Sequence, residues 1–133
     1  MKNSIDVALI LWNTDIIDLL SLVLLRTNLI SCGCEPSEGT DRIEDLILSG
    51  GPSVVLFDLS PPYEQSAAVV QHLFYRFPDR SFVITCANSA LALKNAPWLS
   101  GYTMFQKPYD IDEVANDVRS LVQRSSILVN CSS

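Results

Sequence analysis

The chain has 133 residues, a length that suits one domain with its own hydrophobic core. Hydrophobic residues make up 48% and charged residues 18%, which excludes a disordered chain. Nine basic residues against fifteen acidic ones give a formal net charge of −6, and no Lys/Arg cluster offers the basic surface that nucleic acid requires. No apolar stretch approaches the ~20 residues of a membrane span, and no secretory leader is recognisable. We therefore expect a cytoplasmic protein that binds neither nucleic acid nor membrane.

Strand and helix patterns alternate along the whole chain. Short apolar runs predict strands that are covered on both faces, and segments with apolar residues three and four apart predict helices. In chain order we expect a strand over 5–11, a helix over 15–26, a strand over 29–34, a helix from Asp41 to the Gly50-Gly51-Pro52 stop, a strand over 54–57, a helix over 66–77, a strand over 82–85, a helix over 88–95, a strand over 102–105 and a helix over 110–124.

Polar residues mark the expected helix starts. Thr14 or Asp15 is the predicted cap of the first helix. Asp41 and Asp110 are each followed three residues later by Glu, the spacing of a capping box. These signals fix where the chain turns from each strand into the next helix.

Strands that alternate with helices require right-handed βαβ crossovers, which build a parallel sheet with helices on both faces. We predict an α/β fold of three layers, doubly wound, with five parallel strands in the flavodoxin-like order 2-1-3-4-5. Residues 1–124 form this single domain, and residues 125–133 are expected to be a short Ser-rich tail. In this order, the loops after strands 1, 3, 4 and 5 surround one crevice.

Three of the predicted strands end on residues with chemistry. Asp58, Thr85 and Lys107 follow the third, fourth and fifth apolar runs, and Asn13 follows the first. Ligands gather at the carboxyl ends of strands in open parallel sheets. A carboxylate, a hydroxyl and an ammonium at one edge suggest a site that accepts a phosphoryl group, since phosphoryl transfer depends mostly on positioning and charge neutralisation.

With these residues in this order, the chain resembles the receiver domain of bacterial two-component response regulators over nearly its whole length. The resemblance implies that Asp58 is the phosphoacceptor and that the Thr85 hydroxyl contacts the phosphoryl group. Lys107 with Pro108 matches the family's lysine and its cis-proline-type turn, and Ser60 matches the position whose backbone carbonyl reaches a metal ion.

The chain departs from this family directly after the first strand. Receivers carry two adjacent acids there, which hold Mg²⁺ together with the phosphoacceptor, whereas this chain has Trp12 and Asn13. Three carboxylates and one lysine sum to −2, but Asp58 and Lys107 alone sum to zero. Asp58, Asn13 and Ser60 therefore form at most a weak Mg²⁺ site, because a neutral oxygen is a poor substitute for a carboxylate. Trp12 is either a core aromatic or a plug in the space of the metal ion.

Three further sets of residues bear on function. Met104 stands where receivers often have an aromatic switch residue, and Tyr102, Phe105 and Tyr109 beside it are expected at the surface. The single histidine, His72, is expected on a helix surface. The cysteines lack zinc spacing and are expected to be buried free thiols; they are Cys32, Cys34, Cys86 and Cys131.

These patterns support three hypotheses. The first is a degenerate receiver that signals by docking to a partner, such as a histidine kinase or a downstream effector. The second is a working receiver that a histidine kinase phosphorylates on Asp58, with autophosphorylation from a phosphodonor as its only enzymatic step. The third, a flavodoxin-like ligand binder, is disfavoured because Asn13-Thr14-Asp15 stands where a glycine-rich phosphate loop belongs. A homodimer is a further option, and the partner surface is expected on the face of the fourth helix, fifth strand and fifth helix, or on the first helix.

Overall fold

The computed structural model describes residues 4–132, with side chains described as far as residue 125. In chain order the elements are β1 (Val7–Ile10), α1 (Thr14–Leu25), β2 (Ser31–Cys34), the 3₁₀ helix η1 (Pro36–Glu38), α2 (Thr40–Gly50), β3 (Val54–Asp58), α3 (Tyr63–Arg76), β4 (Ser81–Cys86), α4 (Ser89–Asn95), the 3₁₀ helix η2 (Pro97–Gly101), β5 (Thr103–Gln106) and α5 (Ile111–Ser132).

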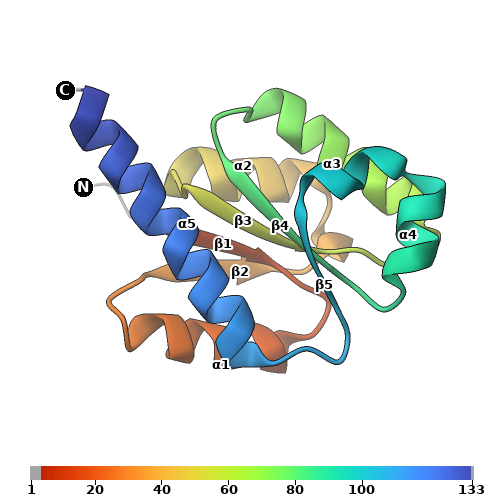
Figure 1. Ribbon diagram of the computed structural model, residues 1–133, viewed down its shortest axis with the longest axis horizontal. Coiled ribbons are helices and arrows are strands. Elements are labelled where there is room, and N and C mark those ends of the chain that lie inside the picture. Colours follow the sequence, from red (N-terminus) through yellow and green to blue (C-terminus); the bar gives the residue numbers. More distant parts are fainter. Residues whose placement is uncertain (1–3, 133) are drawn as a thin grey trace.

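The five strands form one parallel sheet in the order β2-β1-β3-β4-β5 (Figure 1). Every residue of β1 and β3 is buried, as expected for central strands covered on both faces. The predicted fold class and strand order are thus confirmed.

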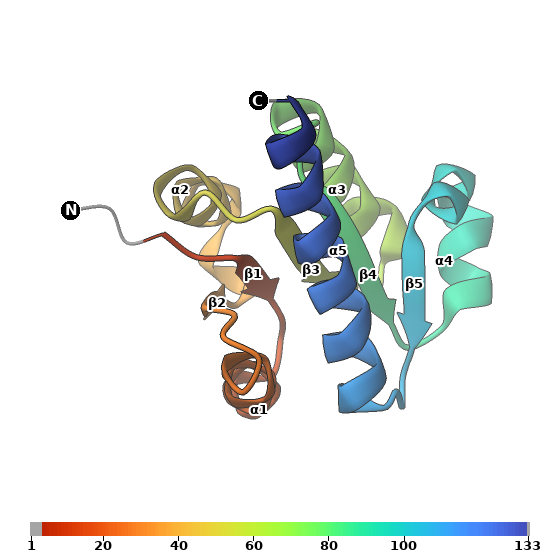
Figure 2. The same cartoon turned by 60° about the vertical axis from the view of Figure 1, so that its left-hand side comes forward.

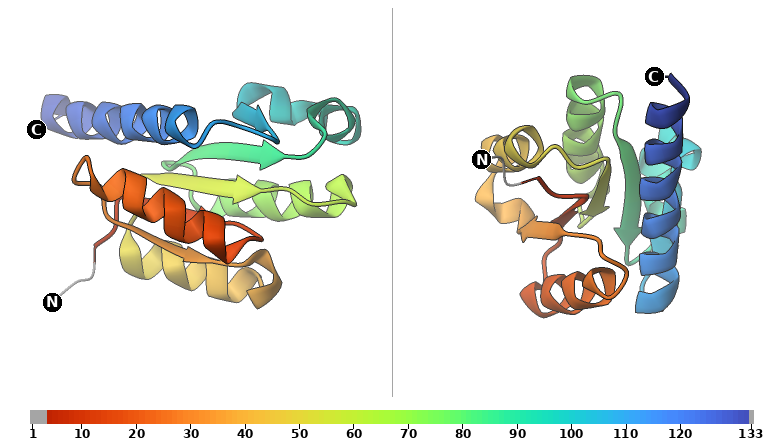
Figure 3. Two further views of the ribbon diagram at one scale, coloured as in Figure 1. Left: turned by 90° about the horizontal axis from the view of Figure 1, so that it is seen from below. Right: turned by 90° about the vertical axis from the view of Figure 1, so that its left-hand side faces the viewer.

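Helices cover both faces of the sheet. α1 and α5 pack on one face, and α2, α3 and α4 pack on the other (Figures 2 and 3). Alternate residues of β1 serve the two cores: Leu9 belongs to the α1/α5 side, whereas Ala8 and Ile10 belong to the other. Each face of the sheet has its own core. The apolar runs that predicted the strands are therefore apolar at every position, rather than at every second one.

Gly33 allows α1 to lie close to β2. A Cβ at this position would lie 2.5 Å from Ile17 Cγ2 and 3.0 Å from the Leu9 carbonyl oxygen. Only glycine therefore fits between the helix and the backbone of the neighbouring strand.

Two helix starts differ from prediction. The N-cap of α1 is Asn13, whose side chain accepts from two backbone N–H groups, so Thr14 and Asp15 lie inside the helix. α2 begins at Thr40, after Gly39, whose φ of +99° turns the chain from η1 into the helix. Asp41 therefore stands in the first turn, and no side chain caps this helix.

Two other helix boundaries also differ from the predicted ones. α3 begins at Tyr63, directly after the cis Pro61–Pro62 peptide bond and before the predicted start at 66. α5 continues to Ser132, beyond the predicted end at 124, because no glycine or proline in this stretch stops it. The expected tail is thus helical up to Ser132. Within the part of the chain that the structure describes, no helix is long and apolar enough to cross a membrane.

Candidate functional site

The three predicted site residues meet at the carboxyl edge of the sheet. Asp58 is the last residue of β3, Thr85 is its register partner in β4, and Lys107 directly follows β5. The carboxyl group is only 3% exposed and the threonine is fully buried. The parallel sheet thus brings together residues that lie far apart in the sequence.

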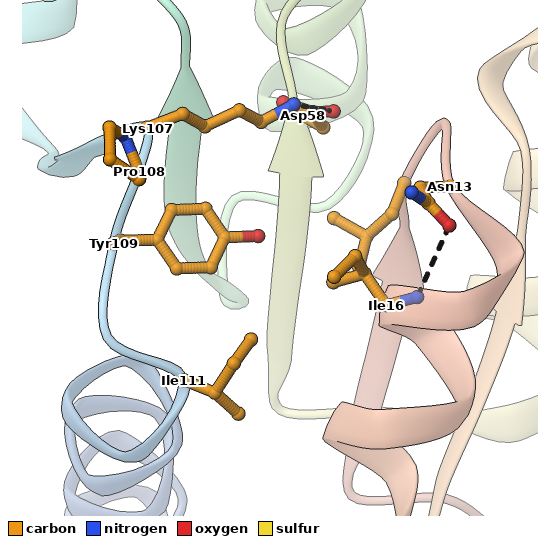
Figure 4. A pocket seen from close by; sticks show the side chains of 8 residues that line it. Asn13, Ile16, Asp58, Lys107, Pro108, Tyr109 and Ile111 are labelled. Atoms are coloured by element: carbon orange, nitrogen blue, oxygen red, sulfur yellow. Dashed lines mark hydrogen bonds and ion pairs between the residues drawn. The ribbon is translucent and has the colours of Figure 1, made fainter.

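Each oxygen of the Asp58 carboxylate has a partner. The Thr85 hydroxyl donates to Oδ1 at 3.0 Å. The Lys107 ammonium donates to Oδ2 at 2.7 Å (Figure 4). The Lys107 side chain remains 43% exposed, so the ion pair has a buried acid and a solvated base. The predicted pairing of Asp58 with Lys107 is confirmed.

Backbone hydrogen bonds hold these strand ends together. The Leu59 N–H donates to the Thr85 carbonyl at 2.8 Å, and the Lys107 N–H donates to the Cys86 carbonyl at 2.8 Å. The Lys107–Pro108 peptide bond is cis, as the resemblance implied. The side chains of the site therefore project from a rigid edge.

The other two expected metal ligands are engaged elsewhere. Asn13 Oδ1 accepts from the backbone N–H of Asp15 at 2.8 Å, as the cap of α1. It also accepts from the backbone N–H of Ile16 at 3.4 Å (Figure 4). The Ser60 carbonyl accepts the hydroxyl of Ser66 at 2.6 Å. Asn13 and Ser60 each line a hollow together with Asp58, and the oxygen of each already accepts a hydrogen bond.

A cavity of about 300 Å³ opens beside the ion pair, between β1, α1 and the start of α5. Apart from Asn13 and the charged pair, its lining is largely apolar, and it comprises Leu11, Asn13, Ile16, Asp58, Lys107, Pro108, Tyr109 and Ile111 (Figure 4). Tyr109 was expected at the surface but is half-buried here. Burial, and to a lesser degree the negative charge of Asp58, raises the pKa of its hydroxyl.

Trp12 lines a different hollow beside Asp58. It is 40% exposed and lines a second hollow of about 280 Å³ together with Pro61, Pro62 and Ser66, among others. Its interpretation as a core aromatic was wrong, because the chain leaves the sheet at this residue. It does not line the cavity that holds Asn13 and Lys107.

Among the described residues, no cysteine or histidine side chain forms a hydrogen bond with Asp58, Thr85 or Lys107. Cys34 and Cys86 are buried free thiols as expected, whereas Cys32 is exposed on the edge strand β2. Cys131 lies outside the residues whose side chains are described. His72 is exposed, as predicted, and pairs with Glu44 of α2.

The sequence did not predict the residues that hold the loop after β4 in place. The Tyr63 hydroxyl accepts the Asn88 N–H at 3.1 Å and is almost fully buried. Gln106 Oε1 accepts from both the backbone N–H and the hydroxyl of Ser89, at 2.9 and 2.8 Å. These hydrogen bonds fix the loop after β4. No local sequence pattern predicts them, because the bonded residues are distant in the chain.

Comparison with known proteins places the chain by its fold. No family model matches the sequence, and no curated protein matches it. Among solved structures, the signal receiver domain of a putative LuxO repressor protein from Vibrio parahaemolyticus has a TM-score of 0.76 at 16% identity, covering 98% of both chains. The receiver domain of Francisella response regulator 1452 has a TM-score of 0.73 at 18% identity, covering 92% of this chain and 99% of that one.

A third solved structure, of a transiently phosphorylated "switch" in bacterial signal transduction, has a TM-score of 0.72 at 22% identity, covering 95% of this chain and 99% of its own. A CheY-like response regulator receiver domain from Methanospirillum hungatei JF-1 has the same TM-score at 12% identity, covering 92% and 97%. The agreement extends along almost the full length of each chain. The protein thus has the CheY-like fold of response regulator receiver domains.

Proposed function

We propose that this chain is an atypical receiver-like module of a two-component signalling system, which works through protein–protein contacts and binds Mg²⁺ weakly. The observation that carries the proposal is the neutralisation of Asp58 by Lys107, with Thr85 bonded to the other carboxylate oxygen. A carboxylate with both oxygens bonded and its charge neutralised is held in place without a phosphoryl group or a metal ion.

The donor set does not fit Mg²⁺, which prefers near-octahedral coordination by several hard oxygens, usually with at least one or two carboxylates. Asp58 is the only carboxylate at this edge among the expected ligands, and its charge is cancelled by Lys107. The Asn13 side-chain oxygen and the Ser60 carbonyl are neutral and each already accepts a hydrogen bond, so neither supplies the negative charge of a second carboxylate. Among the described residues, no group of three or more His, Cys, Asp or Glu side chains could hold a metal ion.

A working receiver phosphorylated on Asp58 by a histidine kinase is the alternative function. In its favour, the cavity beside Lys107 gives a phosphodonor access to the carboxylate from the α1/α5 side. Against it stands the charge balance, since a phosphoryl group adds negative charge, and Lys107 is the one cation among the described residues that line the two hollows beside Asp58. In either case, the partner is a kinase or an effector in the cytoplasm.

Intact-mass measurement separates the two functions. The protein is incubated with acetyl phosphate and Mg²⁺, with Asp58→Asn as the control. We expect no gain of a phosphoryl mass by the unmodified chain. A gain that Asp58→Asn abolishes would show a working receiver and overturn the proposal.

A gain-of-function variant serves as the positive control for the phosphorylation assay. Trp12→Asp with Asn13→Asp restores two acids after β1, and Asp at position 13 still caps a helix well. We expect this double variant to bind Mg²⁺ and to acquire a phosphoryl mass on Asp58. If it binds Mg²⁺ no better than the unmodified chain, then the missing acids are not what weakens the site.

A further inference from the structure

α1 is apolar on two opposite faces. Leu20 and Leu24 are buried against the sheet, as the core requires. Leu19, Leu22 and Leu25 point away from it and are 44%, 61% and 58% exposed. Isolated exposed leucines are common on protein surfaces, but three of them three residues apart form a continuous stripe along a helix.

On the outer face of α1, leucines are placed symmetrically about a central leucine, and residues of opposite charge flank them. Leu22 stands at its centre, Leu19 and Leu25 lie three residues to either side, and Asp18 and Arg26 lie four residues to either side. Positions three and four apart share one face of a helix. Both charged residues are exposed, and neither forms an ion pair within the part of the chain that the structure describes.

We propose that this face binds a second copy of the chain, with the two α1 helices antiparallel and a two-fold axis at Leu22. In this arrangement Leu22 packs against the same residue of the second copy. On either side of that contact, Asp18 and Leu19 of one copy lie in one layer with Leu25 and Arg26 of the other. Each layer then contains two leucines and one acid–base pair.

The symmetry of the pattern selects a second copy over an unrelated partner. A two-fold interface brings one surface onto itself, so each group must meet its complement on the same patch. Here the acid lies before the central leucine and the base lies after it, and antiparallel packing places opposite charges together. The other highly exposed leucines, Leu48 of α2 and Leu91 of α4, have no such symmetric surroundings.

The position of α1 in the fold makes this face accessible. α1 lies beside α5 on one face of the sheet (Figure 3). The exposure of Leu19, Leu22 and Leu25 shows that neither element covers their side chains. Self-association through α1 leaves Asp58 and its hydrogen bonds unchanged. The inference therefore goes beyond the proposed function and holds whether or not Asp58 accepts a phosphoryl group.

Sedimentation equilibrium of the full chain tests the interface, at concentrations up to roughly 1 mM. We expect a monomer–dimer equilibrium for the unmodified protein. Leu22→Lys places two like charges on the axis and should weaken the dimer by about 100-fold or more. Leu48→Lys is the matched control, since its leucine is 57% exposed on α2, and it should leave the dimer unchanged.

A charge swap tests the register of the two helices. Asp18→Arg or Arg26→Asp alone should weaken the dimer by about threefold to tenfold, because two exposed pairs are lost at once. The double variant Asp18→Arg/Arg26→Asp should restore the original association. Circular dichroism of each variant checks that it is folded.

Three results would overturn the proposal. One is an unmodified protein that stays monomeric over the whole concentration range. The second is a dimer that Leu22→Lys leaves intact, or that Leu48→Lys weakens equally, since either would place self-association on another surface. The third is a double charge variant that remains as weak as the single variants.

Discussion

Lys107 Nζ lies 2.7 Å from Asp58 Oδ2 although the two residues are 49 positions apart in the sequence. β3 and β5 are not neighbours in the sheet, so the lysine reaches across the end of β4 to the carboxylate. Thr85, on the strand between them, bonds the other carboxylate oxygen. One buried carboxylate thus connects the ends of three strands.

Removing the lysine should destabilise the fold. Lys107→Met leaves the carboxylate of Asp58, which is 3% exposed, without its positive partner. Breaking a fully buried pair costs roughly 3–5 kcal/mol, and we expect about 1–3 kcal/mol here because the lysine side chain is 43% exposed. Urea unfolding measures the loss. Lys94→Met, at an exposed position of α4, is the control and should stay within about 0.5 kcal/mol.

Variants of Asn13 test whether this residue stabilises α1 as its N-cap. Asn13→Ala removes the acceptor for two backbone N–H groups of α1 and should cost about 1 kcal/mol. Asn13→Asp keeps an acceptor and adds a charge that suits the helix N-terminus, so its stability should equal or exceed that of the unmodified chain. Equal destabilisation by both variants in urea unfolding would contradict the capping role.

The sequence predicted the sheet order and the meeting of Asp58, Thr85 and Lys107 because both follow from short-range rules. Apolar runs locate the strands, and parallel pairing brings their carboxyl ends to one edge. The pairing of the aspartate and the lysine followed from their opposite charges at that edge. None of these steps needs knowledge of side-chain conformation.

Predicting the residues around the site requires side-chain conformations, and the sequence predicted these residues only in part. The cap of α1 is Asn13, whose side-chain oxygen accepts a backbone N–H of the first turn, and not Thr14 or Asp15 as predicted. Trp12 stays exposed because the chain has already left the sheet at that point. Tyr63 reaches Asn88 through a hydrogen bond between distant segments. Propensity and spacing carry no information about these tertiary contacts.

Gly33 should tolerate no side chain. In Gly33→Ala the new Cβ would approach Ile17 Cγ2 to 2.5 Å and the Leu9 carbonyl to 3.0 Å, so α1 or β2 must shift. We expect a loss of about 1–3 kcal/mol in urea unfolding, typical of overpacking. Gly101→Ala is the matched control, because no atom lies within 4 Å of its added Cβ. A Gly33→Ala variant as stable as that control would show that the helix and the strand can move apart without cost.

Cys34 should give the fold a measurable sensitivity to alkaline pH. Burial, with a smaller effect of Glu38, raises the pKa of this thiol from 9.0 to about 11. Between these values the unfolded chain releases the proton while the folded chain keeps it, so the unfolded state gains stability. The free energy of unfolding should therefore fall as pH rises from about 9 to about 11, and this contribution should be fully present below pH 9.

Cys34→Ala isolates this contribution, because the other alkaline groups are common to both proteins. They include Cys86, Tyr102 and Tyr109, whose pKa values are also raised by burial. Truncating a buried side chain lowers the stability of the variant at every pH, so the slope with pH is compared. We expect a shallower fall for Cys34→Ala between pH 9 and 11. Parallel curves for the two proteins would mean that the Cys34 thiol ionises in the folded chain as readily as in the unfolded one.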